Sequence, residues 1–380
     1  MNLKKICYLT TIGLTIRAFF IPQLKALAEN GYDVSVICSF EEGLKEKLGC
    51  KIHYYPVDIP RGISCVSMVK AVCKINAIVR DKQFDIIQYS TPNAGLCGAV
   101  VGKIQKVPIR NYHLMGLRYL GEKGLKRFIL KLLEKITCMF STDIECVSKS
   151  NYKMSINEGL FRQEKGTVVF HGSTGGVELK KFNYNLRKKY REEIRAKYNI
   201  ADSVYVYGFV GRITRDKGIN ELLKAFKQMP GCILLMVGFT DETDTIDREL
   251  YVWSKNCNSI IYTGAVDDVE RYYAAMDCLV LPSYREGFGN VVIEAAAMGT
   301  PAIVTRIPGP IDTSIENRTA LWINPYSVGE LKQAMIKMQY ISKNMEISCV
   351  SYVLKCFDNQ KLISEILKRK NHLYEKTINK

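Results

Sequence analysis

The sequence predicts an α/β fold with two Rossmann-like domains, each built on a parallel sheet, facing each other across a cleft. Three observations support this prediction. The chain has 380 residues, about twice the length of an ordinary domain. Short apolar runs alternate with segments of helical periodicity, which is typical of βαβ units with helices on both faces of a sheet. The alternation weakens near residues 172–200, where GSTGG gives way to a charged stretch, and then starts again.

The first series begins with an apolar run at 4–9 and a turn at Thr-Thr-Ile-Gly. The next segment, 16–31, has apolar residues at helical spacing and stops at Gly31, a typical C-terminal glycine. Runs rich in β-branched residues predict the other strands. The predicted strands are 4–9, 33–38, 51–57, 85–90, 107–113, 142–148 and 167–170, and the further predicted helices are 66–80, 94–105 and 122–140.

The second series repeats the pattern from residue 204 onward. Its predicted strands are 204–211, 232–238, 259–264, 278–283, 301–305 and 320–323, and its predicted helices are 217–229, 245–256, 269–276 and 291–299. We therefore expect a first domain at 1–180 and a second at 181–350. The segment 351–380 is expected to carry a final helix, at about 350–375, that can return to the first domain.

Composition narrows the possible functions. Hydrophobic residues make up 47% and charged residues 24%, which is typical of a globular protein and excludes a disordered or fibrous chain. Lys and Arg number 54 against 38 acidic residues, a net charge of +16, and most of the excess lies in the first half. This excess favours a polyanionic partner: nucleic acid, anionic lipid or a phosphorylated substrate. Nucleic acid is disfavoured, because no aromatic-plus-basic RNA-binding signature occurs and the charge is spread over helices. A Rossmann dehydrogenase is disfavoured because no G-x-G-x-x-G follows the first strand.

The cysteines and the first twenty residues indicate the cellular compartment in which the protein is expected. Thirteen cysteines form no C-x-x-C pair, and their odd number favours a reducing cytosol. No apolar run reaches the ~18–20 residues that span a bilayer. The first twenty residues imitate a signal peptide, but Thr10, Gly13 and Arg17 interrupt the apolar run and no A-x-A site follows. They are interpreted as a first strand and a turn.

The first candidate site is the segment GFVGRITRDKGI at 208–219, in which a strand is followed by Gly211, Arg212 and Lys217 before a helix. Arginine offers a planar fork of donors and lysine a compact ammonium, so the loop suits a diphosphate. A basic strand–helix loop that is simply solvated is the alternative.

The second candidate site is PSYREGFGNVVIEAAAMG at 282–299, with Glu286 on the loop and Glu294 about one and a half turns into the following helix. The helix start favours an anion, and the carboxylates can accept hydrogen bonds from sugar hydroxyls. The alternative is that Glu294 only stabilises its own helix.

The two motifs together, Gly-Arg-(x)4-Lys-Gly and then Glu-Gly-Phe-Gly with a second Glu, resemble the retaining glycosyltransferases of family four. These enzymes have the two-domain GT-B fold, with the nucleotide-sugar held mainly by the second domain. The N-terminal segment, TTIGLTIRAFFIPQLKALAENGYDVSVIC, is similar to the opening of such enzymes in bacterial capsule, O-antigen and exopolysaccharide assembly.

This resemblance implies roles for particular residues. Arg212 and Lys217 would hold the donor diphosphate, and Glu294 would bind the ribose. Glu286 would contact the transferred sugar as a catalytic residue. Phe288, Gly289 and Asn290 would lend backbone N–H groups at the helix start. Gly13 would let the ligand approach the backbone of the first loop closely, and His113 matches the active-site histidine of the family. Taken alone, His113 would more simply be a structural histidine.

The resemblance also implies the reaction. A hexose or N-acetylhexosamine would pass from a nucleotide-sugar, with UDP the expected nucleotide, to a glycan acceptor such as a polyprenyl-diphosphate-linked saccharide in surface polysaccharide synthesis. The donor is a substrate, so no cofactor is expected. No metal is expected either, because Arg and Lys can neutralise the phosphates and the acidic stretch 241–244 is interpreted as a surface turn.

The predicted helix near 116–140 is basic and amphipathic. Its apolar stripe and its basic residues are Leu125, Phe128, Ile129, Leu132, Leu133 and Ile136, and Lys123, Lys126, Arg127, Lys131 and Lys135. Such a helix can rest on an anionic membrane surface, or it can pack its stripe on the sheet as an ordinary surface helix. We expect peripheral binding on the cytoplasmic face of the cell membrane, where a lipid-linked acceptor lies.

Two other functions fit the same fold. The chain could be a non-catalytic partner subunit, although such chains tend to lose the phosphate-binding residues. It could also be a nucleotide-sugar epimerase, which product analysis without an acceptor would reveal.

Overall fold

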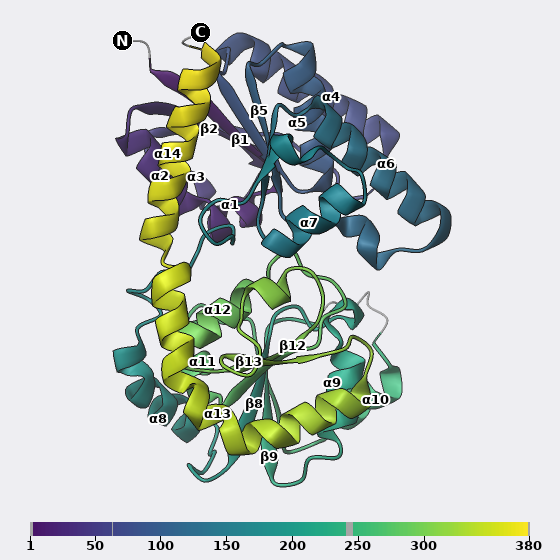
Figure 1. Cartoon of the computed structure of the whole chain (residues 1–380), viewed down its shortest axis with the longest axis vertical. Coiled ribbons are helices and arrows are strands. Elements are labelled where there is room, and N and C mark those ends of the chain that lie inside the picture. The colour runs from purple at the N-terminus through teal and green to yellow at the C-terminus, as the bar shows by residue number, and fades with distance from the viewer. Residues whose placement is uncertain (1–2, 63, 241–245, 379–380) are drawn as a thin grey trace. The chain divides into compact units, whose positions relative to one another are not determined.

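The computed structural model describes residues 3–62, 64–240 and 246–378 and divides into two compact units (Figure 1). One unit contains the chain up to Gly175 together with the segment from Gln360 onward, and the other is Gly176–Asn359. The acidic stretch 241–244 lies outside the described residues. Each unit is an α/β layer structure on its own parallel sheet, as the sequence predicts.

The first unit is built on a seven-stranded sheet of order β3-β2-β1-β4-β5-β6-β7, in which every neighbouring pair is parallel. The strands are β1 (Lys4–Ile12), β2 (Tyr32–Ser39), β3 (Ile52–Pro56), β4 (Ile86–Ser90), β5 (Ile109–Leu114), β6 (Asp143–Cys146) and β7 (Gly166–Thr167). In the centre, Ile6 of β1 pairs with Val34 and Ile86. Such apolar runs suit strands that are covered on both faces.

Helices cover both faces of this sheet. They are α1 (Gly13–Phe19), α2 (Ile21–Glu29), α3 (Leu44–Leu48), α4 (Cys65–Lys82), α5 (Pro92–Ile104), α6 (Gly124–Phe140), α7 (Lys149–Asn157) and α14 (Asn359–Ile378). One core contains side chains of α4, α5 and α6, and the other contains those of α1, α2 and α3. The C-terminal helix α14 packs on the second of these cores (Figure 1, yellow).

The second unit has a six-stranded parallel sheet of order β10-β9-β8-β11-β12-β13. Its strands are β8 (Tyr205–Val210), β9 (Cys232–Val237), β10 (Ile260–Gly264), β11 (Cys278–Leu281), β12 (Ala302–Thr305) and β13 (Ala320–Ile323). Its helices are α8 (Arg187–Lys197), α9 (Ile219–Phe226), α10 (Arg248–Lys255), α11 (Val269–Ala275), α12 (Asn290–Ala297) and α13 (Val328–Cys356). Both sheets thus have a doubly wound order, in which the first strand lies beside the fourth.

Each predicted strand range overlaps a strand, although β7 shares only Thr167 with the predicted range 167–170, and several helices differ from the prediction. The segment 16–31 forms two helices, because the second begins at Ile21 with Pro22 in its first turn. The charged stretch taken as part of a weak zone contains α8.

The predicted C-terminal helix at 350–375 is also wrong in its bounds, since α13 runs to Cys356 and α14 begins at Asn359. Residues 328–349 of α13 escaped prediction because the buried stripe there includes Met335, Met338, Ser342 and Met345, a weaker hydrophobic pattern than a leucine stripe.

Candidate functional site

The two sequence motifs fall on neighbouring loops of the second unit. The first lies on the loop 211–218 after β8, and the second lies on the loop 282–289 after β11. These two strands are adjacent in the sheet although they are the first and fourth of their series. Ligands of doubly wound sheets bind at the carboxyl ends of the strands where the order reverses in this way. The topology therefore places both motifs where this fold binds ligands.

Glycines let the backbones of this region approach closely. At Gly218, with φ +72°, a Cβ atom would lie 2.1 Å from the carbonyl oxygen of Pro282 on the other loop. At Gly238, with φ +134°, a Cβ would lie 1.9 Å from the carbonyl oxygen of Gly211. No side chain fits at such distances, so these positions hold the motif loops against their neighbours.

The centre of the site is an ion pair between the two motifs. The ammonium of Lys217 lies 2.6 Å from Oε1 of Glu286. The same carboxylate oxygen accepts a hydrogen bond of 2.8 Å from Ser283. Both members of the pair are mostly buried, with side chains 17% and 12% exposed. The predicted phosphate-binding lysine and the predicted sugar-binding glutamate therefore lie together.

A second carboxylate sits beside this pair. Oδ1 of Asp216 accepts a 2.6 Å hydrogen bond from Thr214, while its Oδ2 lies 3.5 Å from Arg285 and 3.9 Å from Arg212. Burial alone would raise the pKa of the Asp216 carboxyl. The hydrogen bond from Thr214 and the neighbouring cations outweigh burial and hold that pKa below its usual value. Asp216 is therefore a charged partner of the arginines.

The start of α12 borders the second loop. Gly289, with φ +99°, is the N-cap, and Asn290 is the first helical residue. The side chain of Phe288 is buried and meets the ring of Phe357 edge-on, with centroids 5.7 Å apart. Phe288 thus anchors the loop, while the helix start and its dipole favour an anion nearby.

Glu294 lies farther along the same helix. Its Oε2 accepts a 2.9 Å hydrogen bond from the Tyr273 hydroxyl of α11. Burial raises the pKa of the Glu294 carboxyl, and the bond from Tyr273 offsets part of that effect. A carboxylate held in this way can accept further hydrogen bonds from a diol.

Gly13 belongs to the first unit, where it opens α1 directly after β1. A Cβ there would lie 2.6 Å from Cβ of Glu41, so the position requires glycine. Since β1 lies beside β4, Gly13 also stands at a reversal of strand order. That is the place at which the resemblance expects a close approach of ligand to backbone.

His113 lies on another strand, β5, and is only 3% exposed. Its Nδ1 is 3.3 Å from Oε1 of Glu145, and its ring meets Phe20 edge-on at 5.5 Å. Glu145 also pairs at 3.0 Å with Lys370, a fully buried residue of α14. The imidazole thus lies beside the buried Glu145–Lys370 pair, and its proposed role in the reaction stays a prediction.

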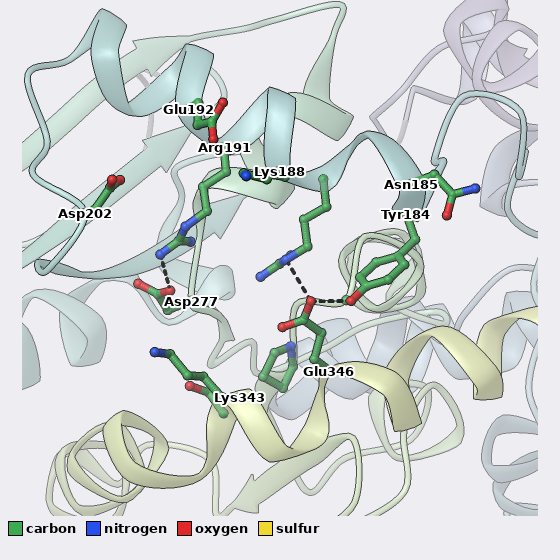
Figure 2. Close-up of a pocket in the computed structure, with 13 residues that line it drawn as sticks. Tyr184, Asn185, Lys188, Arg191, Glu192, Asp202, Asp277, Lys343 and Glu346 are labelled. Carbon is green, nitrogen blue, oxygen red and sulfur yellow. Dashed lines mark hydrogen bonds and ion pairs between the residues drawn. The ribbon is translucent and has the colours of Figure 1, made fainter.

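A pocket of about 650 Å³ lies at the opposite edge of the second sheet, near the amino ends of β11 and β12 (Figure 2). Arg191 pairs at 2.8 Å with Asp277, the residue before β11. Glu346 of α13 accepts a hydrogen bond from Tyr184 and lies 3.4 Å from Arg187. These charged groups are paired with one another, so the pocket walls hold α8 and α13 to the sheet.

The helix α6 exposes most of its predicted apolar stripe, although Leu133 and Ile136 are half-buried. Leu125, Phe128 and Leu132 are 74%, 66% and 47% exposed, and the buried side chains of this helix include Leu130 and Cys138. The alternative interpretation, in which the whole stripe packs on the sheet, is therefore wrong, and the expected membrane binding stays a prediction. The basic residues are partly paired: Lys126 with Glu122, and Arg127 and Lys131 with Glu158. We call the exposed residues Leu125, Phe128, Ile129 and Leu132 the α6 apolar face.

Sequence reasoning missed Asp216 and Ser283, which hold the charged groups of the site. A signal was present in the sequence. Asp216-Lys217 and Arg285-Glu286 are adjacent pairs of opposite charge in opposite order, so two close loops that carry them can form two ion pairs.

Among residues 3–62, 64–240 and 246–378, no three His, Cys, Asp or Glu side chains cluster in a way that could hold a metal ion. Of the helices within those ranges, none combines the length and the hydropathy needed to cross a bilayer.

Comparisons with known families match both units. The family described as "Glycosyl transferases group 1" matches residues 190–345, and "Glycosyl transferase 4-like" matches residues 5–148. The capsular polysaccharide biosynthesis glycosyltransferase CapM of Staphylococcus aureus is 33% identical over 84% of this chain and 83% of its own length. An N,N'-diacetylbacillosaminyl-diphospho-undecaprenol α-1,3-N-acetylgalactosaminyltransferase of Campylobacter jejuni is 25% identical over 87% of this chain and 88% of its own.

Solved structures share the fold along nearly the whole chain. A sucrose-phosphate synthase of Thermosynechococcus elongatus superposes with a TM-score of 0.79 at 19% identity, covering 98% of this chain and 99% of that one. Anabaena HepE in complex with UDP and glucose has a TM-score of 0.78 at 18% identity, covering 97% of this chain and 100% of that one. The two units therefore have the GT-B fold.

Proposed function

The chain belongs to the family-four glycosyltransferases, with a group 1 domain in its second unit, and on that premise we propose that it transfers a sugar from a nucleotide-sugar to a lipid-linked saccharide in surface polysaccharide synthesis. The transferred group is a hexose or N-acetylhexosamine, and the anomeric configuration is retained. The relative from Campylobacter jejuni, whose name describes an undecaprenol-diphosphate acceptor, supports the lipid-linked acceptor.

The observation that carries the proposal is the Lys217–Glu286 pair, set between two motif loops at the carboxyl edge of the sheet. These loops, 211–218 and 282–289, contain four basic residues and two acidic ones, a net charge of +2. A diphosphate bound there meets cationic donors and the start of α12. The neighbouring Glu286 and Glu294 supply acceptors for sugar hydroxyls.

The proposed mechanism uses these groups electrostatically. Arg212, Lys217 and the start of α12 stabilise the charge that develops on the leaving diphosphate. The acceptor attacks from the face on which the diphosphate leaves, and a diphosphate oxygen takes the acceptor proton. Glu286 holds the hydroxyls of the transferred sugar during this step. No divalent cation takes part in this proposal, and transfer is therefore expected to continue in excess EDTA.

The nucleotide is proposed to be UDP, which is the ligand named for the structural relative HepE. A thermal-shift panel with UDP, GDP, ADP and CMP tests both the site and the nucleotide. A ligand at 100 times its Kd adds about 2.7 kcal/mol to the unfolding free energy, so binding raises the melting temperature. The rise is expected with UDP and is expected to disappear in Arg212→Ala.

The matched control is Arg271→Ala on α11, because Arg271 is half-exposed and pairs with Glu193 and Asp268 away from both loops. This variant is expected to keep the full shift. A wild-type protein that no nucleotide stabilises would refute the donor site.

The acceptor side of the proposal rests on the α6 apolar face. Exposed leucine and phenylalanine side chains flanked by lysines are the pattern of helices that lie on anionic membranes, where each nearby basic residue contributes about 1 kcal/mol. We propose that this face holds the first unit on the cytoplasmic side of the cell membrane. The exposed thiols of Cys50, Cys65 and Cys73, all free, suit that reducing compartment.

Co-sedimentation with vesicles tests this surface. The protein is expected to bind vesicles that contain phosphatidylglycerol, less so at high salt, and to bind pure phosphatidylcholine weakly. Phe128→Ser is expected to reduce binding, whereas Tyr340→Ser, at an even more exposed aromatic residue on α13, is expected to have no effect. Equal binding by wild type and Phe128→Ser would refute the role of this face.

A further inference from the structure

Two ion pairs of opposite order join the motif loops. Lys217 pairs with Glu286, and the residue before each of them, Asp216 and Arg285, forms the second pair. The backbone N–H of Tyr284 donates to the carbonyl oxygen of Asp216 at 2.9 Å. This bond fixes the register in which the two charged pairs face each other.

Asp216 holds more than one cation. Its Oδ1 is occupied by the short bond from Thr214, which leaves Oδ2 toward Arg285 at 3.5 Å and Arg212 at 3.9 Å. Both distances are longer than those of a good hydrogen bond, so the carboxylate attracts the two guanidinium groups chiefly through charge. Arginines from different loops are thereby gathered around one carboxylate beside Lys217.

Without Asp216, the positive charges at the loop ends would repel one another, and the long side chains would move apart into solvent. With it, the guanidinium of Arg285 is kept near the lysine that the proposed function assigns to the diphosphate. Its side chain is 31% exposed, so the group is partly accessible to a ligand. A fork of N–H donors suits phosphate oxygens better than a point charge does.

We propose that Arg285 is a further diphosphate-binding residue of this enzyme and that Asp216 is its positioning residue. This inference rests on the proposed function, because it takes the loop region as the donor site. It adds a cation from the β11 loop to Arg212 and Lys217 of the β8 loop. The diphosphate is then held by cations from both loops at the strand reversal. These cations fix its orientation and also neutralise its negative charge.

The test measures the affinities of nucleoside diphosphates and of the matching monophosphates by titration calorimetry, with UDP and UMP first and the GDP and ADP pairs as alternatives. Arg285→Gln is expected to weaken diphosphate binding about tenfold or more, because a charge-assisted contact is lost. Monophosphate binding is expected to fall less. Arg285→Lys is expected to recover part of the loss, and the control Arg271→Gln to bind as the wild type does.

Asp216→Asn separates positioning from charge. This variant raises the net charge of the loops by one, so a purely electrostatic role of Asp216 would make diphosphate binding tighter. A positioning role makes it weaker, by several-fold, because both arginines lose the group that holds them. Tighter binding in Asp216→Asn would overturn the assignment of Asp216.

The two levels of the proposal fail in different ways. If the wild type binds none of the three diphosphates, the proposed donor site itself falls and Arg285 falls with it. If the wild type binds one of them and Arg285→Gln keeps the same ratio of diphosphate to monophosphate affinity, only the role of Arg285 is refuted.

Discussion

The second sheet carries an ion pair at the amino ends of its strands and another at their carboxyl ends, here called the amino edge and the carboxyl edge. The two pairs have almost the same length but different surroundings. At the amino edge, Arg195 lies 2.8 Å from Asp277, and at the carboxyl edge Lys217 lies 2.6 Å from Glu286. Arg195 also donates to the backbone carbonyl groups of Ala201, Asp202, Val204 and Ala275. Asp277 in turn accepts the backbone N–H of Val206 at 2.8 Å.

This difference shows that a buried ion pair by itself does not identify a site. The charges at the amino edge are bound to the backbone, so they fix the position of α8 and leave little for a ligand. The Lys217–Glu286 pair joins side chains of two loops at a reversal of strand order, next to the start of α12. A ligand can replace one partner of such a side-chain pair without breaking hydrogen bonds of the backbone. The following predictions test this distinction.

The largest effect is expected at the carboxyl edge. Lys217→Ala and Glu286→Ala should each lower the rate of sugar transfer by at least about 100-fold, because each removes a group that acts on the diphosphate or the transferred sugar. Circular dichroism should show that both variants remain folded. Either variant with nearly full turnover would refute the assignment of these residues.

The reverse result is expected at the amino edge. Arg195 is 1% exposed, and Arg195→Ala removes the guanidinium that joins Asp277 to four backbone carbonyl groups, although Arg191 still pairs with Asp277. The unfolding free energy should fall by about 1–3 kcal/mol, because buried carbonyl groups lose hydrogen bonds while the charge of Asp277 stays paired with Arg191. Turnover per folded molecule should stay within about twofold of the wild type.

Urea unfolding and assays at a temperature where the variant is folded measure these two quantities. The matched control is Lys189→Ala, since Lys189 lies on the same helix with its side chain 68% exposed. It should change neither quantity. If Arg195→Ala lowers turnover more than the folded fraction explains, the amino edge takes part in function and the comparison fails.

Glu294 is buried and hydrogen-bonded within the protein, like the groups of the amino edge, and it is also proposed to bind the ligand. The pH dependence of the stability of Glu294→Gln tests the first of these features. Burial raises the pKa of Glu294 above the usual 4.5, so ionisation costs native-state stability as pH rises through and beyond that value. Glu294→Gln avoids this cost. Its stability relative to wild type should therefore be lowest below pH 4.5 and increase toward neutral pH.

The same variant should lose about tenfold in affinity for the nucleotide, because a neutral amide is a weaker acceptor for the ribose hydroxyls than a carboxylate is. Thermal unfolding from pH 4 to 8 and nucleotide titration measure the two effects. A stability difference that does not change with pH would show that the carboxyl is not held as described.

The sequence predicted those parts of the fold that depend on short-range patterns. Apolar runs located the strands except β7, which overlaps its predicted range only at Thr167, and Gly211, Gly218 and Gly289 marked the loops where the backbone needs a positive φ. The pairing of Asp216 with Arg285 escaped prediction because 68 residues separate them and only the strand order brings their loops together.

The sequence also left open which way particular side chains face. The apolar stripe of α6 could face the sheet or the solvent, and the structure buries Leu130 and Cys138 in its place. The family pattern marked His113 without revealing that Lys370 of α14 pairs with the neighbouring Glu145. In both cases the deciding contact comes from a distant element, which helical or strand periodicity does not describe.

The smallest effect is expected for the pocket of Figure 2. It tests whether an exposed cation at the amino edge has a function. Lys343 of α13 lines this pocket and is exposed. Lys343→Ala should change the unfolding free energy by no more than about 0.5 kcal/mol, as is usual for an exposed side chain, and should leave transfer unchanged. Calorimetric unfolding and the transfer assay measure both. A loss of transfer with normal stability would mean that a ligand or partner uses this pocket, and exposed cations at the amino edge would then be as functional as those of the motif loops. An unchanged variant leaves the position at the strand ends, rather than the presence of charge, as the property that separates the two edges.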